Sequence, residues 1–525
     1  MEQPETDKDA TWAASQPSIV EHFSIDGLFG YRSISLSSKS AATVLIAKNG
    51  SGKTTLIAAL DAFLRGQFTR FSTLKFDKIT CRFHNSTDSL ILYRNDVDEL
   101  INLLAHSDIV AGAKTWEVEP LALLELVEIA AAEAKIVDLM DNPTFYAIYV
   151  KLGYNSALAR RHCERLAKAM SGRTPNIDVL RSAIRSALGN IEIVYLPTYR
   201  RIELSIPTPD ALPGRRKSKS IFSRLGISRS GLYTADVQFG LGDISDRLRA
   251  LYSEMLLISN QGYGKVSANI INDLISGNYK NEGLSPGAPP SKEALEIFFS
   301  RIKKTEREWQ YDRGPYQNSV SVPDLDKFYS GQVAVDAQPF LNYFLEQLNS
   351  VIQQTRGSEE LVEAFIGSCN RYLSDDDDDE FQNQDYDNRV SISDNKRLTF
   401  NRRNFKVKVT SLAGNVEVPI ESLSSGEKQM ISLFARLYLY PGPKIVLIDE
   451  PELSLSLDWQ RKILPDVLRA PTCKQVIAIT HSPFIFDNEL EPFAGSLELK
   501  VFSKQSLSLF PSSQFNDDGE EDGGE

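Results

Sequence analysis

A glycine-rich stretch near the start of the chain has the composition of a phosphate-binding loop. Residues 47–55 read Ala-Lys-Asn-Gly-Ser-Gly-Lys-Thr-Thr and lie between an apolar run at 43–46 and a segment with helical character. Glycines let successive backbone N–H groups point at phosphate oxygens, and the N-terminus of the following helix adds its dipole. We expect the Lys53 amine to reach the β- and γ-phosphates of a nucleotide and the Thr54 hydroxyl to bind Mg²⁺. The other expected nucleotide contacts are Asn49, Gly50, Ser51, Gly52 and Thr55.

Two consecutive carboxylates follow a second apolar run, at 445–448. Four apolar residues in a row predict a strand that is buried on both faces and that presents Asp449 and Glu450 at its carboxyl end. We expect Asp449 to hold the Mg²⁺ shell and Glu450 to polarise a water molecule. Because the carboxyl ends of parallel strands meet at one edge of a sheet, this pair is expected beside the glycine-rich loop.

A third motif opens a predicted helix about 25 residues before Asp449, where residues 423–429 read Leu-Ser-Ser-Gly-Glu-Lys-Gln. A serine at a helix start, together with backbone N–H groups around a glycine, forms an anion site. A serine-capped helix start would by itself explain the two serines, but it would not explain why this stretch occurs together with the other motifs. The residues expected to contact nucleotide here are Ser424, Ser425, Gly426 and Glu427.

A histidine follows another buried strand. The run at 476–480 is mostly apolar and His481 comes directly after it. A lone histidine is more often structural, but this one ends the strand that follows the Asp-Glu strand. We therefore expect His481 to hydrogen-bond a γ-phosphate and the attacking water. Residues 452–458 lie between these two strands.

The elements that must hold these motifs alternate between strand and helix at both ends of the chain. The sequence predicts strands between 19 and 47, a helix over 53–65 and a hairpin over 75–95. The last 130 residues or so again alternate, with strands at 405–409, 445–448 and 476–480 and helices at 425–440 and 459–468. Apolar strands that alternate with helices indicate a parallel sheet. The expected fold class is α/β, with a largely parallel sheet, N-terminal antiparallel strands and a large α-helical insertion.

Six segments are expected along the chain. They are a disordered lead (1–17), the first half of the α/β domain (18–95), a helical insertion (96–372), an acidic linker (373–394), the second half of the α/β domain (395–511) and an acidic tail (512–525). No heptad pattern is sustained in the insertion, which argues against a long coiled-coil arm.

The composition is that of a globular protein, with 42% apolar and 24% charged residues in 525. Six acids at 375–380 and six more at 517–525 equal the whole net charge of −12, so the rest is formally neutral. Such acidic blocks are usually solvated loops or tails. The four cysteines form no Cys-x-x-Cys pair, and neither a signal peptide nor an 18-residue apolar run is recognisable, so we expect a cytoplasmic protein.

A basic segment at 214–231 contains no acid and only one aromatic residue. It could neutralise phosphates of a nucleic acid, or it could be a solvated loop. Its candidate contacts are Arg215, Arg216, Lys217 and Lys219.

The four motifs, in this order, resemble a split ABC-type ATPase head of the SMC, RecF and OLD group. Ser425 stands where the signature of that superfamily has glycine, Glu427 where it has glutamine, and Ala47 where the loop usually begins with glycine. No glutamine is recognisable for a Q-loop. The stretches at 195–203 and 239–244 are similar to those of PtuA-type ATPases, the ATPase subunits of Septu and Septu-like retron antiphage systems.

This resemblance implies a protein that binds ATP and Mg²⁺, with Glu450 and His481 as catalytic residues. It implies a dimer in which the signature of one head caps the γ-phosphate on the loop of the other. It also implies a partner HNH endonuclease and, in retrons, a reverse transcriptase with its RNA–DNA product. The chain itself has only five scattered histidines, and we expect no nuclease site of its own. Two alternatives are a nucleotide-dependent scaffold with little turnover and a RecF-like DNA-repair ATPase.

Overall fold

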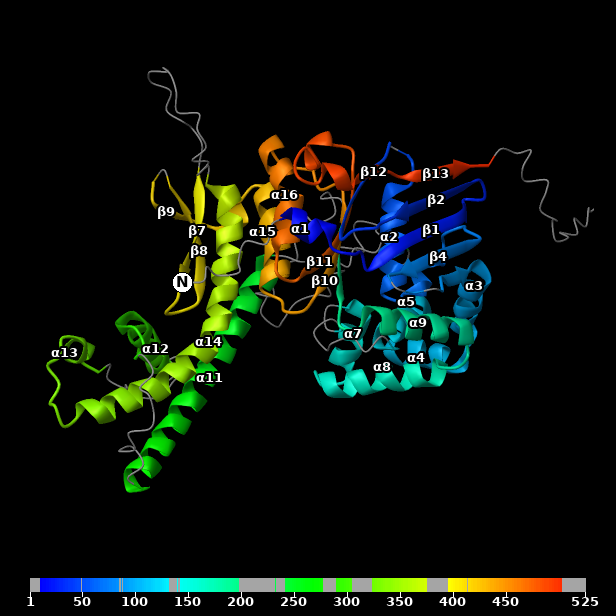
Figure 1. The fold of residues 1–525 in the computed structure, drawn as a ribbon. Coiled ribbons are helices and arrows are strands. Elements are labelled where there is room, and N and C mark those ends of the chain that lie inside the picture. The colour runs from blue at the N-terminus through cyan, green and yellow to red at the C-terminus, as the bar shows by residue number, and fades with distance from the viewer. Residues whose placement is uncertain are drawn as a thin grey trace, which may run out of the picture.

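The two ends of the chain build one α/β domain, and the middle forms a helical subdomain and a two-helix arm (Figure 1). The computed structural model describes residues 10–48, 50–84, 86, 88–131, 139, 142–197, 232, 241–276, 289–304, 323–374, 395–412 and 414–502. Among these residues, no helix combines the length and the apolar composition needed to cross a bilayer.

A five-stranded parallel sheet forms the centre, in the order β12-β3-β11-β10-β6. Its strands come from distant parts of the sequence: β3 (Ala42–Ile46), β6 (Glu192–Leu196), β10 (Lys444–Asp449), β11 (Cys473–Thr480) and β12 (Ala494–Ser496). In β10 and β11 successive side chains enter two different apolar clusters, so both faces are buried. Such strands read as continuous apolar runs, which is why the sequence revealed them.

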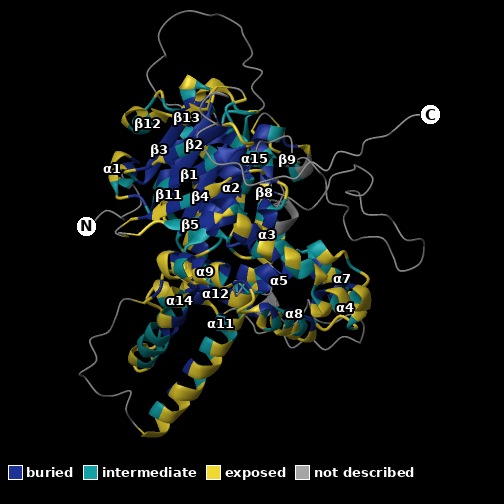
Figure 2. Ribbon diagram, turned by 90° about the vertical axis from the view of Figure 1, so that its right-hand side faces the viewer, coloured by how far each residue is buried: buried dark blue, intermediate teal, exposed yellow. Residues whose placement is uncertain are grey.

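Helix α2 (Lys53–Leu64) lies between the parallel sheet and a second, antiparallel sheet. The antiparallel sheet has the order β13-β2-β1-β4-β5, with β1 (Val20–Leu28), β2 (Arg32–Ser37), β4 (Lys78–Phe83), β5 (Leu90–Tyr93) and β13 (Glu498–Val501). All but one of the twelve residues of α2 are buried. A helix that is apolar all round requires cover on several sides, and the two sheets supply it. Figure 2 shows this region as almost entirely buried.

The opposite face of the parallel sheet is covered by α15 (Ser425–Tyr438) and α16 (Leu457–Arg469). Helix α1 (Ala10–Ser15) packs against α16, with Ala10 and Ala14 fully buried. This differs from the expected disordered lead over 1–17. Six residues rich in alanine are too few for a helix by themselves, so the helix depends on this packing.

Strand β6 is a second difference from the expectation, because it lies within the segment predicted to be a helical insertion. It pairs in parallel with β10, in the register Leu447 to Tyr195. Five residues offer little periodicity, and the sequence places them between helical patterns. Strand β6 thus returns the chain to the central sheet in the middle of the insertion.

The first part of the insertion forms a compact helical subdomain below the antiparallel sheet (Figure 1). Its helices are α3 (Arg94–Asn102), α4 (Ser107–Trp116), α5 (Pro120–Ala131), α7 (Pro143–Lys151), α8 (Ser156–Met170) and α9 (Pro175–Leu188). Asparagines cap two of them: Asn142 accepts hydrogen bonds from the first turn of α7, and Asn155 from Leu158 N–H in α8. These caps explain where the two helices begin.

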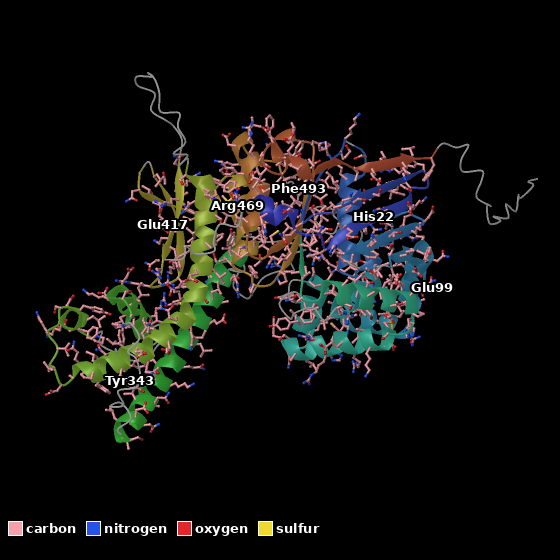
Figure 3. All side chains as sticks on the ribbon, in the orientation of Figure 1. His22, Glu99, Tyr343, Glu417, Arg469 and Phe493 are labelled. Atoms are coloured by element: carbon pink, nitrogen blue, oxygen red, sulfur yellow. The ribbon has the colours of Figure 1, made fainter. Side chains whose placement is uncertain are left out.

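The second part of the insertion forms an arm of two 36-residue helices, α11 (Leu241–Ser276) and α14 (Gln338–Leu373). At 1.5 Å per residue each is about 54 Å long. A Cβ on Gly262 would lie 2.4 Å from Val351, so glycine permits the close approach of the helices. Tyr343 of α14 donates a 2.7 Å hydrogen bond to Asp273 of α11 (Figure 3).

Shorter elements complete the arm. The helices α12 (Lys292–Lys304) and α13 (Leu325–Tyr329) cover its far end, and a three-stranded sheet of β7 (Lys396–Asn401), β8 (Lys406–Ser411) and β9 (Val416–Val418) lies where α14 returns to the α/β domain. The arm is far shorter than a long coiled coil. The expected fold class, α/β with a parallel sheet, N-terminal antiparallel strands and a large helical insertion, is confirmed.

One buried side chain ties the two ends of the chain together. Gln475 of β11 is fully buried, and its Oε1 accepts hydrogen bonds of 2.9 Å from the backbone N–H groups of Ile19 and Val20. Its Nε2 donates to Val20 O (3.0 Å) and to Ser38 Oγ (3.2 Å). The amide therefore satisfies polar groups that the packing of the two sheets removes from water.

We predict that Gln475→Leu lowers the free energy of unfolding by about 3 kcal/mol or more, because each buried group left without a partner costs about 1–3 kcal/mol. Urea denaturation of the full chain measures the effect. The exposed neighbour Lys474 supplies the control: Lys474→Ala should change stability by less than about 0.5 kcal/mol. Equal effects of both variants would show that Gln475 does not hold the sheets together.

Candidate functional site

Three neighbouring strands end at one edge of the parallel sheet, and each is followed by one of the motifs. The glycine-rich loop follows β3, Asp449 ends β10, and His481 follows β11. The register pairs Ile46 with Thr480 and Asp449 with Ile479, so the three strand ends lie level. The carboxyl edge of a parallel sheet is where α/β proteins bind their ligands.

The glycine-rich loop has the backbone that only glycine adopts without strain. Gly50 has φ +78° and Gly52 has φ +97°, and α2 begins at Lys53 directly after Gly52. The first N–H groups of an α-helix have no acceptor within the helix, and here they face the end of the sheet. Asn49 lies outside the described residues.

Lys53, Glu450 and His481 converge on one another. Lys53 Nζ lies 3.2 Å and His481 Nε2 3.5 Å from the same atom, Glu450 Oε1. The Lys53 side chain is 5% exposed and that of Glu450 21%. Glu450 has φ +56°, a conformation that is rare for residues other than glycine, and its N–H donates to Ile479 O at 2.8 Å. This backbone turns the carboxylate away from the end of β10 and toward the loop.

Several donors around the loop lack an acceptor. Among the described residues, Lys53 Nζ, Ser51 Oγ and Arg32 Nε are buried atoms without a hydrogen-bond partner, although Lys53 forms the ion pair with Glu450. Buried donors are normally satisfied, so three unsatisfied ones at one loop indicate a missing acceptor-rich ligand. A polyphosphate supplies such acceptors, and these donors therefore fit one.

Arg32 is a residue of this site that the sequence analysis missed. It follows a tight turn at the start of β2, and its Nη1 donates a 3.0 Å hydrogen bond to Gly50 O. Its guanidinium lies 5.3 Å from the ring centroids of both Phe29 and Tyr31. A lone arginine in a strand carries no signal of its own. Its importance comes from the packing of β2 beside the loop.

Thr54 and Asp449 are the two oxygen donors that the sequence analysis proposed as Mg²⁺ ligands. Thr54 is in the first turn of α2, and Asp449 is the last residue of β10, with 1% of its surface exposed. Hydroxyl and carboxylate oxygens are the ligands that Mg²⁺ prefers. Thr55, also named as a contact, is buried within α2.

The signature residues form a tightly built helix start. Ser424 is the N-cap of α15: its hydroxyl accepts from Glu427 N–H (3.3 Å), and its own N–H donates to Glu427 Oε2 (2.6 Å). Lys396 also binds the Glu427 carboxylate, at 3.0 Å. A Cβ on Gly426 would lie 2.3 Å from Ser454 O, so only glycine fits there. The structure thus gives Glu427 a capping role, and its carboxylate has partners within its own chain.

The signature does not meet the glycine-rich loop of its own chain. Helix α15 packs on one face of the parallel sheet and α2 on the other (Figure 1). Ser424 is exposed and Ser425 half-buried, whereas Gly426 is buried. The serine-led end of α15 is therefore open to another molecule.

Glu452 is a second residue that the sequence analysis did not single out as functional. Its Oε1 accepts from the backbone N–H of His481 and its Oε2 from Thr480 Oγ1, each at 2.8 Å. Burial raises the pKa of Glu452, and the charge of Glu450 adds to the rise. The carboxylate thus fixes the backbone of His481 to the loop at 452–458.

Gln460 of α16 strengthens the same connection. Its Nε2 donates to Leu455 O at 3.1 Å, and its Oε1 accepts from Ser482 Oγ at 2.6 Å. The loop that follows Glu450 and the residues that follow β11 are therefore held together by two side chains. Glutamate and glutamine residues are too common in sequences for the hydrogen bonds of Glu452 and Gln460 to be predicted from the sequence.

Some expected contacts lie outside the described residues. These are the basic candidates Arg215, Arg216, Lys217 and Lys219, and also residues 198–203 and 239–240 of the two stretches that resemble PtuA-type ATPases.

Comparison with known families supports an ATPase. Residues 296–487 match a family described as "AAA domain, putative AbiEii toxin, Type IV TA system". This segment of the chain is therefore similar to an AAA-type ATPase domain. The matched range is less than half of the chain; it includes the signature, Asp449, Glu450 and His481, and does not include the glycine-rich loop. No curated protein matches the chain.

Solved structures include two SMC heads among the similar chains. One is the Smc head domain with an extended coiled coil bound to the C-terminal domain of ScpA from Pyrococcus furiosus, with 13% identity, a TM-score of 0.34, and 93% of this chain and 98% of that chain covered. The other is the SmcHead bound to the C-winged helix domain of ScpA, with 11% identity, a TM-score of 0.33, and 94% and 100% covered.

We predict that Glu452→Gln lowers kcat for ATP hydrolysis about tenfold or more and leaves KM for ATP nearly unchanged. The amide keeps the size of the side chain but presents an NH₂ group to one of two donors, which displaces His481, whereas the glycine-rich loop is untouched. Steady-state phosphate release measures both constants. Glu491→Gln, at an exposed glutamate, is the matched control. A rise in KM at constant kcat would contradict the role given to Glu452.

Proposed function

We propose that this protein is an ATP-binding and ATP-hydrolysing component of a bacterial antiphage defence system, of the Septu or retron-associated kind. The observation that carries the ATPase part is the convergence of Lys53 Nζ and His481 Nε2 on Glu450 Oε1, at 3.2 Å and 3.5 Å. A phosphate-binding lysine, a carboxylate base and a polar sensor are the groups that water-mediated phosphoryl transfer needs.

Glu450 is the general base in this proposal. Its carboxylate forms an ion pair with Lys53, at 3.2 Å. A γ-phosphate competes for the lysine, because it offers several charged oxygens to an amine that has no hydrogen-bond partner here. Once Lys53 turns to the phosphate, Glu450 is free to accept the proton of the attacking water. Binding of substrate thus prepares the base.

The other residues position and neutralise charge. The N–H groups at 50–55 and the Lys53 amine would hold the phosphates, with Arg32 supporting the loop through Gly50 O. Thr54 and Asp449 would hold Mg²⁺, which neutralises charge on the β- and γ-phosphate oxygens. His481 would donate to the γ-phosphate from a backbone position set by Glu452.

The complete site would require two heads. The exposed Ser424 and the N-terminus of the 14-residue helix α15 form an anion site on the far side of the sheet from the loop of the same chain. Placed against the loop of a second copy, Ser424 would cap the γ-phosphate there. Leu457, an apolar side chain with 52% of its surface exposed in the segment after Glu450, would be covered by the partner.

The proposed cellular role is control of a nuclease in trans. Closing and opening of the two heads would gate a partner HNH endonuclease, with a reverse transcriptase and its RNA–DNA product as further partners in the retron form. The support for this step is the likeness of the stretches at 195–203 and 239–244 to PtuA-type ATPases. The system would act in the cytoplasm.

We predict that Glu450→Gln slows ATP turnover by about 10²–10⁴-fold, the usual contribution of a general base, and prolongs the ATP-bound dimer. Phosphate release measures the first effect, and size-exclusion chromatography with light scattering in Mg·ATP measures the second. Lys53→Ala is the control that should bind ATP poorly and stay monomeric. Unaltered turnover in Glu450→Gln would exclude the proposed mechanism, and turnover in the wild type no faster than in Lys53→Ala would favour a scaffold.

The nuclease part is tested separately, by mixing the chain with a purified HNH endonuclease of the PtuB type. We expect DNA cleavage by the complex to depend on ATP and to differ between wild type and Glu450→Gln. DNA cleavage that depends neither on the nucleotide nor on the substitution would refute the proposed control of the nuclease. It would leave the ATPase assignment intact.

A further inference from the structure

The α7–α8 layer of the helical subdomain has an excess of basic side chains. Residues 143–173 contain six basic side chains and one acid, Glu164, whereas the whole chain has a net charge of −12. The acid is already paired, since Glu164 Oε1 binds Arg160 at 2.7 Å. The neighbouring Asp178 accepts a hydrogen bond from Gly172 N–H. Lys151 pairs with Glu117 at 3.1 Å, so the positive charge that remains lies mainly on α8.

The positive charges form a strip on one side of α8. Arg161, Arg165 and Lys168 are spaced by four and three residues, so they lie on one face of the helix, and all three are exposed. Among the described residues, Arg161 and Lys168 have no ion-pair or hydrogen-bond partner. Arg165 Nη2 lies 2.6 Å from Nδ1 of the neighbouring His162. We call these three residues the α8 strip.

Aromatic side chains continue the strip at its N-terminal end. Tyr154, in the turn before α8, is 65% exposed, and Tyr146 of α7 is 50% exposed. Both contact Tyr149, with ring centroids 5.5 Å and 5.9 Å away. Leu158, 39% exposed, precedes Arg161 by three residues within α8, and Tyr154 lies just before the N-cap of that helix. Large aromatic side chains are usually explained by their burial, and the rings of Tyr146 and Tyr154 are largely exposed.

The shape of the layer leaves this surface open. Helix α8 buries its other side, with Ala159, Cys163 and Met170, against the rest of the helical subdomain. It is the outermost helix of that subdomain (Figure 1), and Figure 3 shows its side chains projecting away from the molecule. Figure 2 shows a large exposed fraction on the same helix.

We propose that the α8 strip and its adjoining tyrosines bind single-stranded nucleic acid. Cations without partners attract phosphates, and exposed aromatic rings stack on bases, which are accessible in a single strand and paired in a duplex. From Arg161 to Lys168 the helix rises about 10 Å. This site is distinct from the nucleotide site and from the basic segment at 214–231, which has a single aromatic residue.

The test uses the full chain and fluorescence anisotropy with labelled 15-nucleotide probes, oligo-dT, oligo-rU and a dT–dA duplex. The triple variant Arg161→Gln, Arg165→Gln, Lys168→Gln should weaken binding of the single strands by at least tenfold. It should also reduce the slope of log affinity against log salt by about 2, as expected when three phosphate contacts are lost. Tyr154→Ala should weaken binding about tenfold without changing the salt slope, because stacking is not ionic.

The matched control changes the same net charge elsewhere. Lys39, Lys474 and Lys500 are exposed lysines outside α8, and their triple replacement by glutamine should leave the affinity within about twofold. Unaltered ATP turnover and circular dichroism in both triple variants show that the fold is kept. The dT and rU probes distinguish DNA from RNA as the source of the strand.

Three outcomes overturn the proposal. The first is the absence of measurable binding of either single-stranded probe at low salt. The second is equal weakening by both triple variants, which would mean that binding follows net charge alone. The third is tighter binding of the duplex, which would remove the role given to the tyrosines. All three leave the ATPase mechanism untouched, because no residue of the α8 strip belongs to it.

Discussion

The parallel pairing of β3 with β11 is the interaction on which the site depends. It joins residues 42–46 to residues 476–480, more than 400 positions along the chain, and sets the glycine-rich loop beside His481. The pairing of β11 with β10 then brings Asp449 and Glu450 to the same edge. The entropy of closing so long a loop grows only slowly with its length, so a large insertion between the halves is tolerated. The insertion contributes β6 to the same sheet and is thus not a mere appendage.

Much of this arrangement could be predicted because the important strands are buried on both faces. Such strands are continuous apolar runs, and a polar residue directly after the run marks the edge where ligands bind. Strand β6 was not predicted, because its five residues are too few to show a clear strand periodicity between segments with a helical pattern. The two long arm helices were also hidden, since Gly262 and Gly264 interrupt the α11 pattern. Glycine at 262 is explained only by Val351 on the other helix.

The parts of the site that could not be predicted act through tertiary contacts. Arg32 matters because β2 packs beside the loop, and Glu452 because its carboxylate reaches the backbone of His481. Neither residue has a local pattern that separates it from ordinary surface arginines and glutamates. Glu427 was expected to contact nucleotide from its place in a motif, whereas its carboxylate caps α15 and binds Lys396. A motif thus predicts where a helix starts more reliably than it predicts the role of each side chain within the motif.

The contacts around the loop at 452–458 link the candidate catalytic residues to the signature helix. Glu450 forms an ion pair with Lys53, the first residue of the helix that follows the glycine-rich loop. Gly426 lies against Ser454 O, and the loop at 452–458 is bound through Glu452 and Gln460 to the residues after β11. A partner that presses on this loop therefore acts on His481 as well as on the signature helix. Because Glu452 hydrogen-bonds the backbone of His481 directly, a displacement of this loop would also move His481.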